Sequence, residues 1–196
     1  YTRGVIELLG SLNRLTVANP MRLEIETQFL HSNEIKPIHE KLTRALNNKG
    51  ITVYSSTPLL ATVNDTADKI HSLAFGLRHI GVEFHHIYVA GWPLQKAWSA
   101  THPVDLQDVI DISTRVRRDG SGREIPRYVI LTELGEVDFG LTSKISGKNE
   151  NMSLTLLPYD IDYFKAMDSD FTWPEHVSTD DNGHPVVPVS GLTSSA

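Results

Sequence analysis

Between residues 22 and 134 the sequence alternates between β-strand patterns and amphipathic helix patterns, and this alternation restricts the possible folds more than any other feature. Strand patterns occupy residues 22–30, 51–60, 82–90 and 127–134, and helix patterns occupy residues 37–48, 66–80 and 104–117. Strands joined by a helix pair in parallel, because the helix returns the chain to the end where the preceding strand began. The sequence therefore predicts an α/β fold in which the four strands lie side by side in chain order.

The number of strand–helix units predicts the architecture. A closed eight-stranded barrel takes about 250 residues, whereas only three or four units are present here. A helix pattern at 5–15 precedes the first strand, which favours part of a larger barrel over a small open sheet. We therefore predict a partial (βα) barrel with parallel strands in residues 1–135. A short β-hairpin-like and irregular C-terminal region is predicted for residues 136–196, with two strands joined by the GKNEN turn and an irregular tail from about residue 168.

The composition argues against several classes of protein and of binding site. The chain has 196 residues, of which 40% are hydrophobic, enough for one sizeable core. Its formal charge of −6 argues against non-specific nucleic-acid binding, and its apolar runs are shorter than a membrane helix requires. Zero cysteines exclude disulfides and iron–sulfur ligation within these residues. The first residues lead directly into a helix pattern, so we expect no signal peptide and a cytoplasmic location.

Polar side chains gather where the predicted strands end. The stretch TQFLHSNEI, residues 27–35, begins like a strand and then carries Gln28, His31, Asn33 and Glu34 within a few positions. Ligands of parallel α/β sheets bind beyond the carboxyl ends of the strands, so these positions, Ser55–Thr57 and Tyr88 form the candidate site. In the alternative interpretation, Asn33 and Glu34 only cap or orient the helix that begins near Pro37.

Two further motifs bear on the site. His85 and His86 are adjacent in a strand, so their side chains are expected on opposite faces and not on one metal ion. His86 and Tyr88 share a face and are expected to point into the barrel. The nine histidines show no H-x-H or H-E-x-x-H spacing, so we expect no metal site built by the protein. Asn64 or Asp65 is expected to cap the helix at 66–80.

Three segments in order carry a resemblance to a known family. TQFLHSNEI, GITVYSSTPLLATVND (50–65) and GVEFHHIYVAGWP (81–93) resemble the C-terminal half of the lysine 2,3-aminomutase family of radical S-adenosylmethionine (SAM) enzymes. The resemblance covers about residues 22–130. It implies a partial barrel whose N-terminal half carries a cysteine triad for a [4Fe–4S] cluster, which cleaves SAM to a radical. It also implies a rim near SAM and pyridoxal phosphate (PLP), with the cofactor-binding residues Gln28, His31, Asn33, Ser56, His86 and Tyr88.

The chain departs from that family at three positions of one site. Gly91 stands where the lysine enzymes carry a substrate-binding aspartate, and Leu131 aligns with the second. Asp138 aligns with the lysine that forms the PLP Schiff base, and Lys144 lies six residues later. A carboxylate cannot form an imine. The resemblance therefore implies SAM and a cluster for a complete family member, but neither lysine as the substrate nor covalent PLP.

Two interpretations of function stay open at this point. In the first, the chain is the C-terminal portion of a radical SAM aminomutase-like isomerase with an unknown small-molecule substrate, inactive without the N-terminal half of the barrel. In the second, it is a degenerate barrel that binds a small molecule or a partner without catalysis. An unrelated βα enzyme would need a nucleophile–base pair, and the sequence offers no nucleophile elbow or phosphate loop. The open edge of a half barrel also suggests a homo-oligomer.

Overall fold

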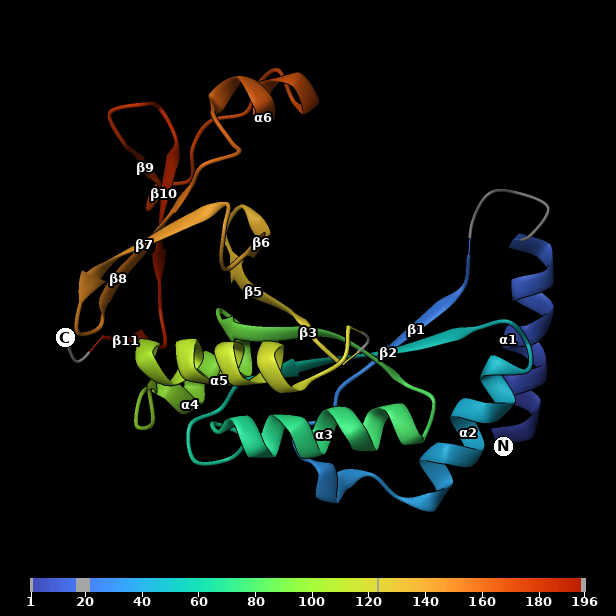
Figure 1. Ribbon diagram of the computed structural model, residues 1–196. Coiled ribbons are helices and arrows are strands. Elements are labelled where there is room, and N and C mark those ends of the chain that lie inside the picture. The colour runs from blue at the N-terminus through green and yellow to red at the C-terminus, as the bar shows by residue number, and fades with distance from the viewer. Residues whose placement is uncertain (1, 17–21, 123, 195–196) are drawn as a thin grey trace. The chain divides into compact units, whose positions relative to one another are not determined.

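A computed structural model describes residues 2–16, 22–122 and 124–194 (Figure 1). Its helices are α1 (Thr2–Thr16), the 3-10 helix η1 (Ser32–Glu34), α2 (Pro37–Asn47), α3 (Ala67–His79), α4 (Pro93–Ser99), α5 (Leu106–Asp119) and α6 (Ile161–Met167). Its strands are β1 (Glu24–Thr27), β2 (Thr52–Pro58), β3 (Glu83–Ala90), β4 (Val104–Asp105), β5 (Arg127–Thr132), β6 (Gly135–Asp138), β7 (Ser143–Lys148), β8 (Asn151–Leu156), β9 (Ser178–Thr179), β10 (Pro185–Val189) and β11 (Leu192–Thr193).

The order of the main sheet confirms the predicted order of its strands. The hydrogen-bonded order is β1-β2-β3-β5-β6, so the four predicted strands lie side by side as the sequence indicates. β1 pairs with β2 in parallel, with Glu24 opposite Thr52, whereas β6 pairs with β5 in the antiparallel sense. Within the described residues the sheet is open, with β1 and β6 at its edges. The fold is thus mixed α/β with parallel strands, and no closed barrel is seen in this part of the chain.

The chain divides into two compact units, each built from separate stretches of sequence. Unit 1 comprises Tyr1–Thr57, Thr66–His86 and Thr114–Pro126, and unit 2 comprises Pro58–Asp65, Ile87–Ser113 and Arg127–Ala196. Unit 1 holds β1, most of β2, the first half of β3 and the helices α1, α2 and α3. Unit 2 holds the second half of β3, α4, β5 and the whole C-terminal region.

The core of unit 1 is formed largely by α3. Ile70, Leu73 and Leu77 recur at helical spacing and are completely buried, as the apolar stripe predicts. The prediction of the residue that caps this helix was wrong: Thr66 is the N-cap, and its hydroxyl accepts from the backbone N–H of Lys69 at 3.4 Å. Asn64 and Asp65 instead accept hydrogen bonds from the loop that precedes it, because their short side chains reach backbone groups there.

The helix α1 carries an apolar stripe that its own unit does not cover. Val5, Leu8, Leu12 and Leu15 follow helical spacing, yet 43–70% of each is exposed. Asn13 ties the helix to the chain around it, donating to the carbonyl of Lys49 and accepting from the backbone N–H of Leu23. No helix among the described residues is long and apolar enough to cross a membrane.

Two helix starts in unit 2 differ from the prediction. A helix was predicted at 104–117, but α5 begins at Leu106, after the short strand β4. The carboxylate of Asp105 accepts from the backbone N–H of Gln107 at 2.7 Å, so the acidic residue starts this helix. The helix α4 was not predicted, although Pro93 lies in its first turn, where proline is favoured.

The C-terminal region is more regular than predicted. β7 and β8 form the expected antiparallel hairpin, and Asn149 in its turn has a positive φ of 54°. The expectation of an irregular tail was wrong, because β10 pairs with β8 and with β9 and buries Val187 and Val189. Two prolines in the PVVPV segment conceal the alternation of buried valines, since proline usually argues against a strand.

Glu124 provides a test of unit 1 through the pH dependence of its stability. Its buried carboxylate accepts from the backbone N–H of Ser121 at 2.9 Å and pairs closely with the Arg78 guanidinium. The backbone hydrogen bond from Ser121, followed by that from Arg78, lowers the pKa of Glu124. A depressed pKa in the folded state stabilises the fold above the unfolded-state pKa of about 4.3. This stabilisation is lost as the pH falls through the folded-state value.

We therefore expect Glu124→Gln to lower the free energy of unfolding at pH 7, and the deficit to shrink progressively as the pH falls from about 5 to 3. Urea unfolding at several pH values measures it, and Glu175→Gln is the control because Glu175 is exposed. A deficit of constant size across this pH range would contradict the assignment.

Candidate functional site

A polar face runs across β1 and β2 in unit 1. The parallel register sets Glu24 and Glu26 on the same face as Tyr54 and Ser56, because alternate residues of a strand share a face. Tyr54 donates its hydroxyl proton to Glu24 at 3.1 Å, and Ser56 makes a close hydrogen bond to the Glu26 carboxylate. Burial, followed by the hydrogen bond to Glu24, raises the pKa of Tyr54. Both carboxylates of β1 are therefore positioned by hydroxyl groups of β2.

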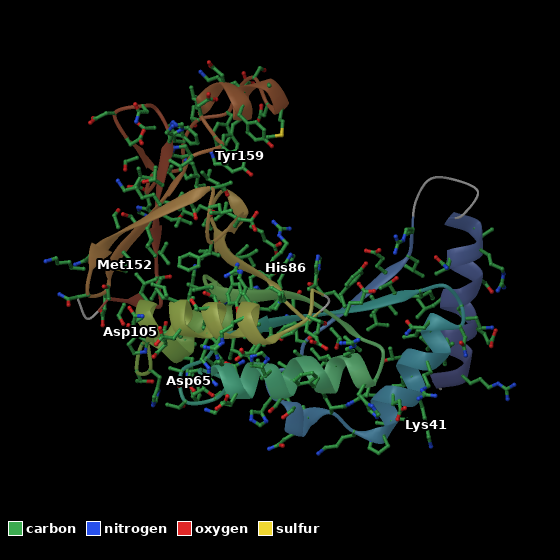
Figure 2. The ribbon with its side chains drawn as sticks, in the orientation of Figure 1. Lys41, Asp65, His86, Asp105, Met152 and Tyr159 are labelled. Atoms are coloured by element: carbon green, nitrogen blue, oxygen red, sulfur yellow. The ribbon has the colours of Figure 1, made fainter. Side chains whose placement is uncertain are left out.

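His85 and His86 extend this cluster, contrary to the expectation that they cannot meet. Their rings stack with centroids 3.8 Å apart and planes 20° apart, and the His85 ring also lies 4.9 Å from the Tyr54 ring. Strand alternation fixes the direction of Cβ, whereas the ring nitrogens follow from two further torsions of each histidine. His86, which Figure 2 labels, is 6% exposed. His85 is exposed.

The TQFLHSNEI segment mainly holds its own loop. His31 accepts from the backbone N–H of Asn33 at 3.2 Å and caps η1, and the Glu34 carboxylate accepts from the backbone N–H of Leu30 at 2.7 Å. The side chains of Gln28 and Asn33 are exposed. Glu34 thus fits the local, chain-orienting alternative, and so does His31, which was expected to serve a ligand. A ligand-binding role for Gln28 and Asn33 stays a prediction.

Tyr88, the predicted site residue in unit 2, is buried against β6. Its hydroxyl makes a close hydrogen bond to the Glu136 carboxylate, and its ring centroid lies 5.0 Å from that of Trp92. Sequence reasoning missed Glu136, because β6 was not expected and its neighbours in the sheet were therefore unknown. A carboxylate therefore holds the Tyr88 hydroxyl, and an indole contacts its ring.

Two buried amides organise the ends of β2 and β3 that belong to unit 2. Gln95, in α4, donates to the carbonyls of Tyr88 at 2.7 Å and Leu59 at 3.0 Å. Asn64 accepts from the backbone N–H of Leu60 at 2.7 Å and donates to the carbonyl of Pro58 at 3.0 Å. Both amides are at most 3% exposed, so each satisfies buried backbone groups that no water reaches.

A cavity of about 580 Å³ lies in unit 2. Its polar lining includes Lys96, Glu133 and Glu150, and both Gly91 and Leu131 line it as well. Gly91 has a φ of +99°, and a Cβ at this position would lie 1.9 Å from the carbonyl oxygen of Leu131. The two positions that the resemblance assigns to substrate carboxylates therefore meet in one cavity, without a carboxylate at either and without room for a side chain at Gly91.

The position assigned to the Schiff-base lysine is occupied by a structural ion pair. Asp138 accepts hydrogen bonds from Nη2 and Nε of Arg127 at 2.7 and 3.1 Å. Lys144 lies in β7 opposite Thr155 and is exposed. These residues do not fit covalent PLP, because the amine is absent from the position and a carboxylate–guanidinium pair fills it. The chain also has no cysteine to hold an iron–sulfur cluster.

Comparison with known proteins gives one weak relative and no family. No protein-family model matches the chain. A protein of Aquifex aeolicus (strain VF5) with the name "Putative L-lysine 2,3-aminomutase" is 25% identical over 118 residues. The match covers 60% of this chain and 31% of that protein, so the matched part spans about a third of the length of that protein.

The close approach at Gly91 predicts that an aspartate at this position destabilises the fold. We expect Gly91→Asp to lower the free energy of unfolding by about 2 to 4 kcal/mol, because a side chain at positive φ is strained and its Cβ displaces the Leu131 carbonyl. Gly122→Asp is the matched control, since a Cβ at Gly122 meets no atom within 4 Å. Urea unfolding of both variants measures the difference, and equal stabilities would show that the backbone contact does not matter.

Proposed function

We propose that this chain is the C-terminal portion of a radical SAM, aminomutase-like isomerase that acts on a small molecule. The 118-residue similarity to the Aquifex aeolicus protein carries the proposal. The parallel order β1-β2-β3-β5 supports it, because the three resembling segments end on neighbouring strands. In this proposal SAM and a [4Fe–4S] cluster supply the radical that begins the isomerisation, and the cluster ligands lie outside these 196 residues.

The residues of this chain serve as one wall of the site in this proposal. Gln28, Asn33, Ser56 and His86, all in unit 1, are the side chains that we assign to the cofactor-facing rim, and His31 holds the loop that carries Asn33. Tyr88, in unit 2, stays a separate prediction. The strand β1 is an edge of the sheet, and an edge strand offers unpaired backbone groups to a further strand. We propose that the N-terminal half of the barrel pairs there. A second copy of the chain is the alternative occupant of that edge.

The substrate proposed for this site is not lysine. The lysine enzymes of the resembling family use two aspartates and a PLP lysine, and this chain has Gly91, Leu131 and Asp138 at those positions. The structure gives a local reason for two of the three residues: Gly91 touches the carbonyl of Leu131, and Asp138 pairs with Arg127. The cavity is lined by charges of both signs, from Lys96, Glu133 and Glu150, and such charges suit a polar substrate.

The decisive experiment is anaerobic reconstitution of the full-length product of the gene with iron and sulfide. We expect the broad visible absorbance of a bound cluster and conversion of SAM to 5′-deoxyadenosine. The 196-residue chain is the matched control and is expected to show neither, because it contains no cysteine. A full-length product that binds no cluster and leaves SAM intact would overturn the proposal in favour of a non-catalytic binding module.

A second experiment tests the departure from lysine chemistry. We expect PLP added to the full-length protein to form no internal aldimine, so borohydride leaves no reduced adduct on any lysine of this region. We also expect no isomerisation of lysine. A reduced adduct mapped to Lys144 would contradict the prediction, because it would show that another amine has replaced the one absent at Asp138.

A further inference from the structure

We infer that Glu26, His85 and His86 form a binding site for a borderline divalent transition metal such as Zn²⁺. Each of the three offers one ligand atom, and these atoms all lie within 4.8 Å of one another. All three residues belong to unit 1, with Glu26 on β1 and both histidines on β3. The inference does not depend on the proposed isomerase function, because it concerns only side chains within this chain.

The donor set selects the class of metal. Two imidazole nitrogens and one carboxylate oxygen are typical ligands of zinc and its neighbours, whereas magnesium and calcium take oxygen ligands alone. Three protein ligands leave a coordination position for water, as in zinc sites that are not purely structural. Because Glu26 and His85 are exposed, solvent and metal can reach the site, while the buried His86 forms its inner side.

Neighbouring side chains of β2 hold two of the three ligands in place. The Ser56 hydroxyl donates to the Glu26 carboxylate, and a carboxylate has further acceptor positions for a metal. The Tyr54 ring packs against the His85 ring at 4.9 Å, and Tyr54 is itself fixed by Glu24. Such outer contacts orient metal ligands, and they commonly change metal affinity by about 10- to 100-fold when removed.

The local charge favours a cation. Two further carboxylates lie close to the site in the sheet: Glu24 accepts from the Tyr54 hydroxyl, and Glu83 precedes His85 by two residues in β3. Arg22 partly offsets Glu24, with which it forms an ion pair at 3.1 Å. With neutral imidazoles, the carboxylate of Glu26 contributes the single negative charge of the site itself.

Metal binding requires one ring to turn. Stacked imidazoles hold their nitrogen lone pairs in nearly parallel planes 20° apart, whereas a shared metal must lie close to both ring planes. The exposed His85 is the ring that turns, because the buried His86 has less freedom. Binding should therefore replace the Tyr54–His85–His86 stack with convergent coordination.

The test is a titration of the metal-free 196-residue chain with Zn²⁺ by calorimetry and with Co²⁺ by visible absorbance. The chain has no cysteine, so thiolate binding cannot produce the signal. We expect one equivalent to bind with micromolar affinity or tighter. Glu26→Gln and His85→Asn, both at exposed positions, are expected to weaken binding at least about tenfold, and Ser56→Ala to weaken it by a similar factor.

The matched controls are Glu175→Gln and His176→Asn, which alter an exposed carboxylate and an exposed histidine of unit 2 and are expected to leave the affinity unchanged. The ring contact between Tyr54 and His85, followed by NMR, should be lost when the metal is added. No zinc binding in the micromolar range would overturn the inference. So would a loss of affinity as large in His176→Asn as in His85→Asn, because it would show adventitious binding to surface histidines.

Discussion

The arrangement of unit 2 depends on hydrogen bonds to the buried backbone groups at the ends of its strands. The chain leaves β2 and β3 through loops whose carbonyls and N–H groups are shielded from water, and each unpaired group would cost about 1–3 kcal/mol. Asn64 and Gln95 satisfy these groups with their amides, which offer both donors and acceptors in one short side chain. In the same unit the backbone at Gly91 lies so close to Leu131 that a Cβ at Gly91 would be 1.9 Å from its carbonyl oxygen.

In unit 1, one face of the parallel strands carries polar side chains. Parallel sheets usually bury apolar residues on both faces, but here the glutamates of β1 accept hydrogen bonds from Tyr54 and Ser56 of β2. Glu24 and Glu26 are exposed, so water and the two hydroxyl groups share the solvation of these carboxylates. The pairing of Glu26 with Ser56 and the position of the His85 ring against Tyr54 thus place a carboxylate and two imidazoles within 4.8 Å.

The sequence was sufficient for what depends on local periodicity. The stripe of Ile70, Leu73 and Leu77 predicts α3, and the alternation of strands with helices predicts the order of the main sheet. What the sequence could not show depends on partners from distant segments. Tyr88 meets Glu136 only because β6 joins the sheet beside β5.

For His85 and His86, strand alternation predicts the direction of each Cβ but not the position of each ring nitrogen. The strand β10 was not predicted, because prolines like those in its sequence are typical of a loop. The position of Glu26 in the cluster requires the register of β1 against β2, which no local pattern contains. Elements with a clear hydrophobic period were therefore predictable, whereas α4, β6 and β10 and the side-chain clusters were not.

The contact between Gly91 and Leu131 also restricts how this protein can change over time. An aspartate at Gly91 would place its Cβ 1.9 Å from the carbonyl oxygen of Leu131, so the backbone would have to move to admit it. Substitutions elsewhere in the cavity, at Lys96 or Glu133, meet no comparable barrier in the described contacts. The charged residues of the cavity can therefore change more readily than Gly91, where the main chain obstructs a carboxylate side chain.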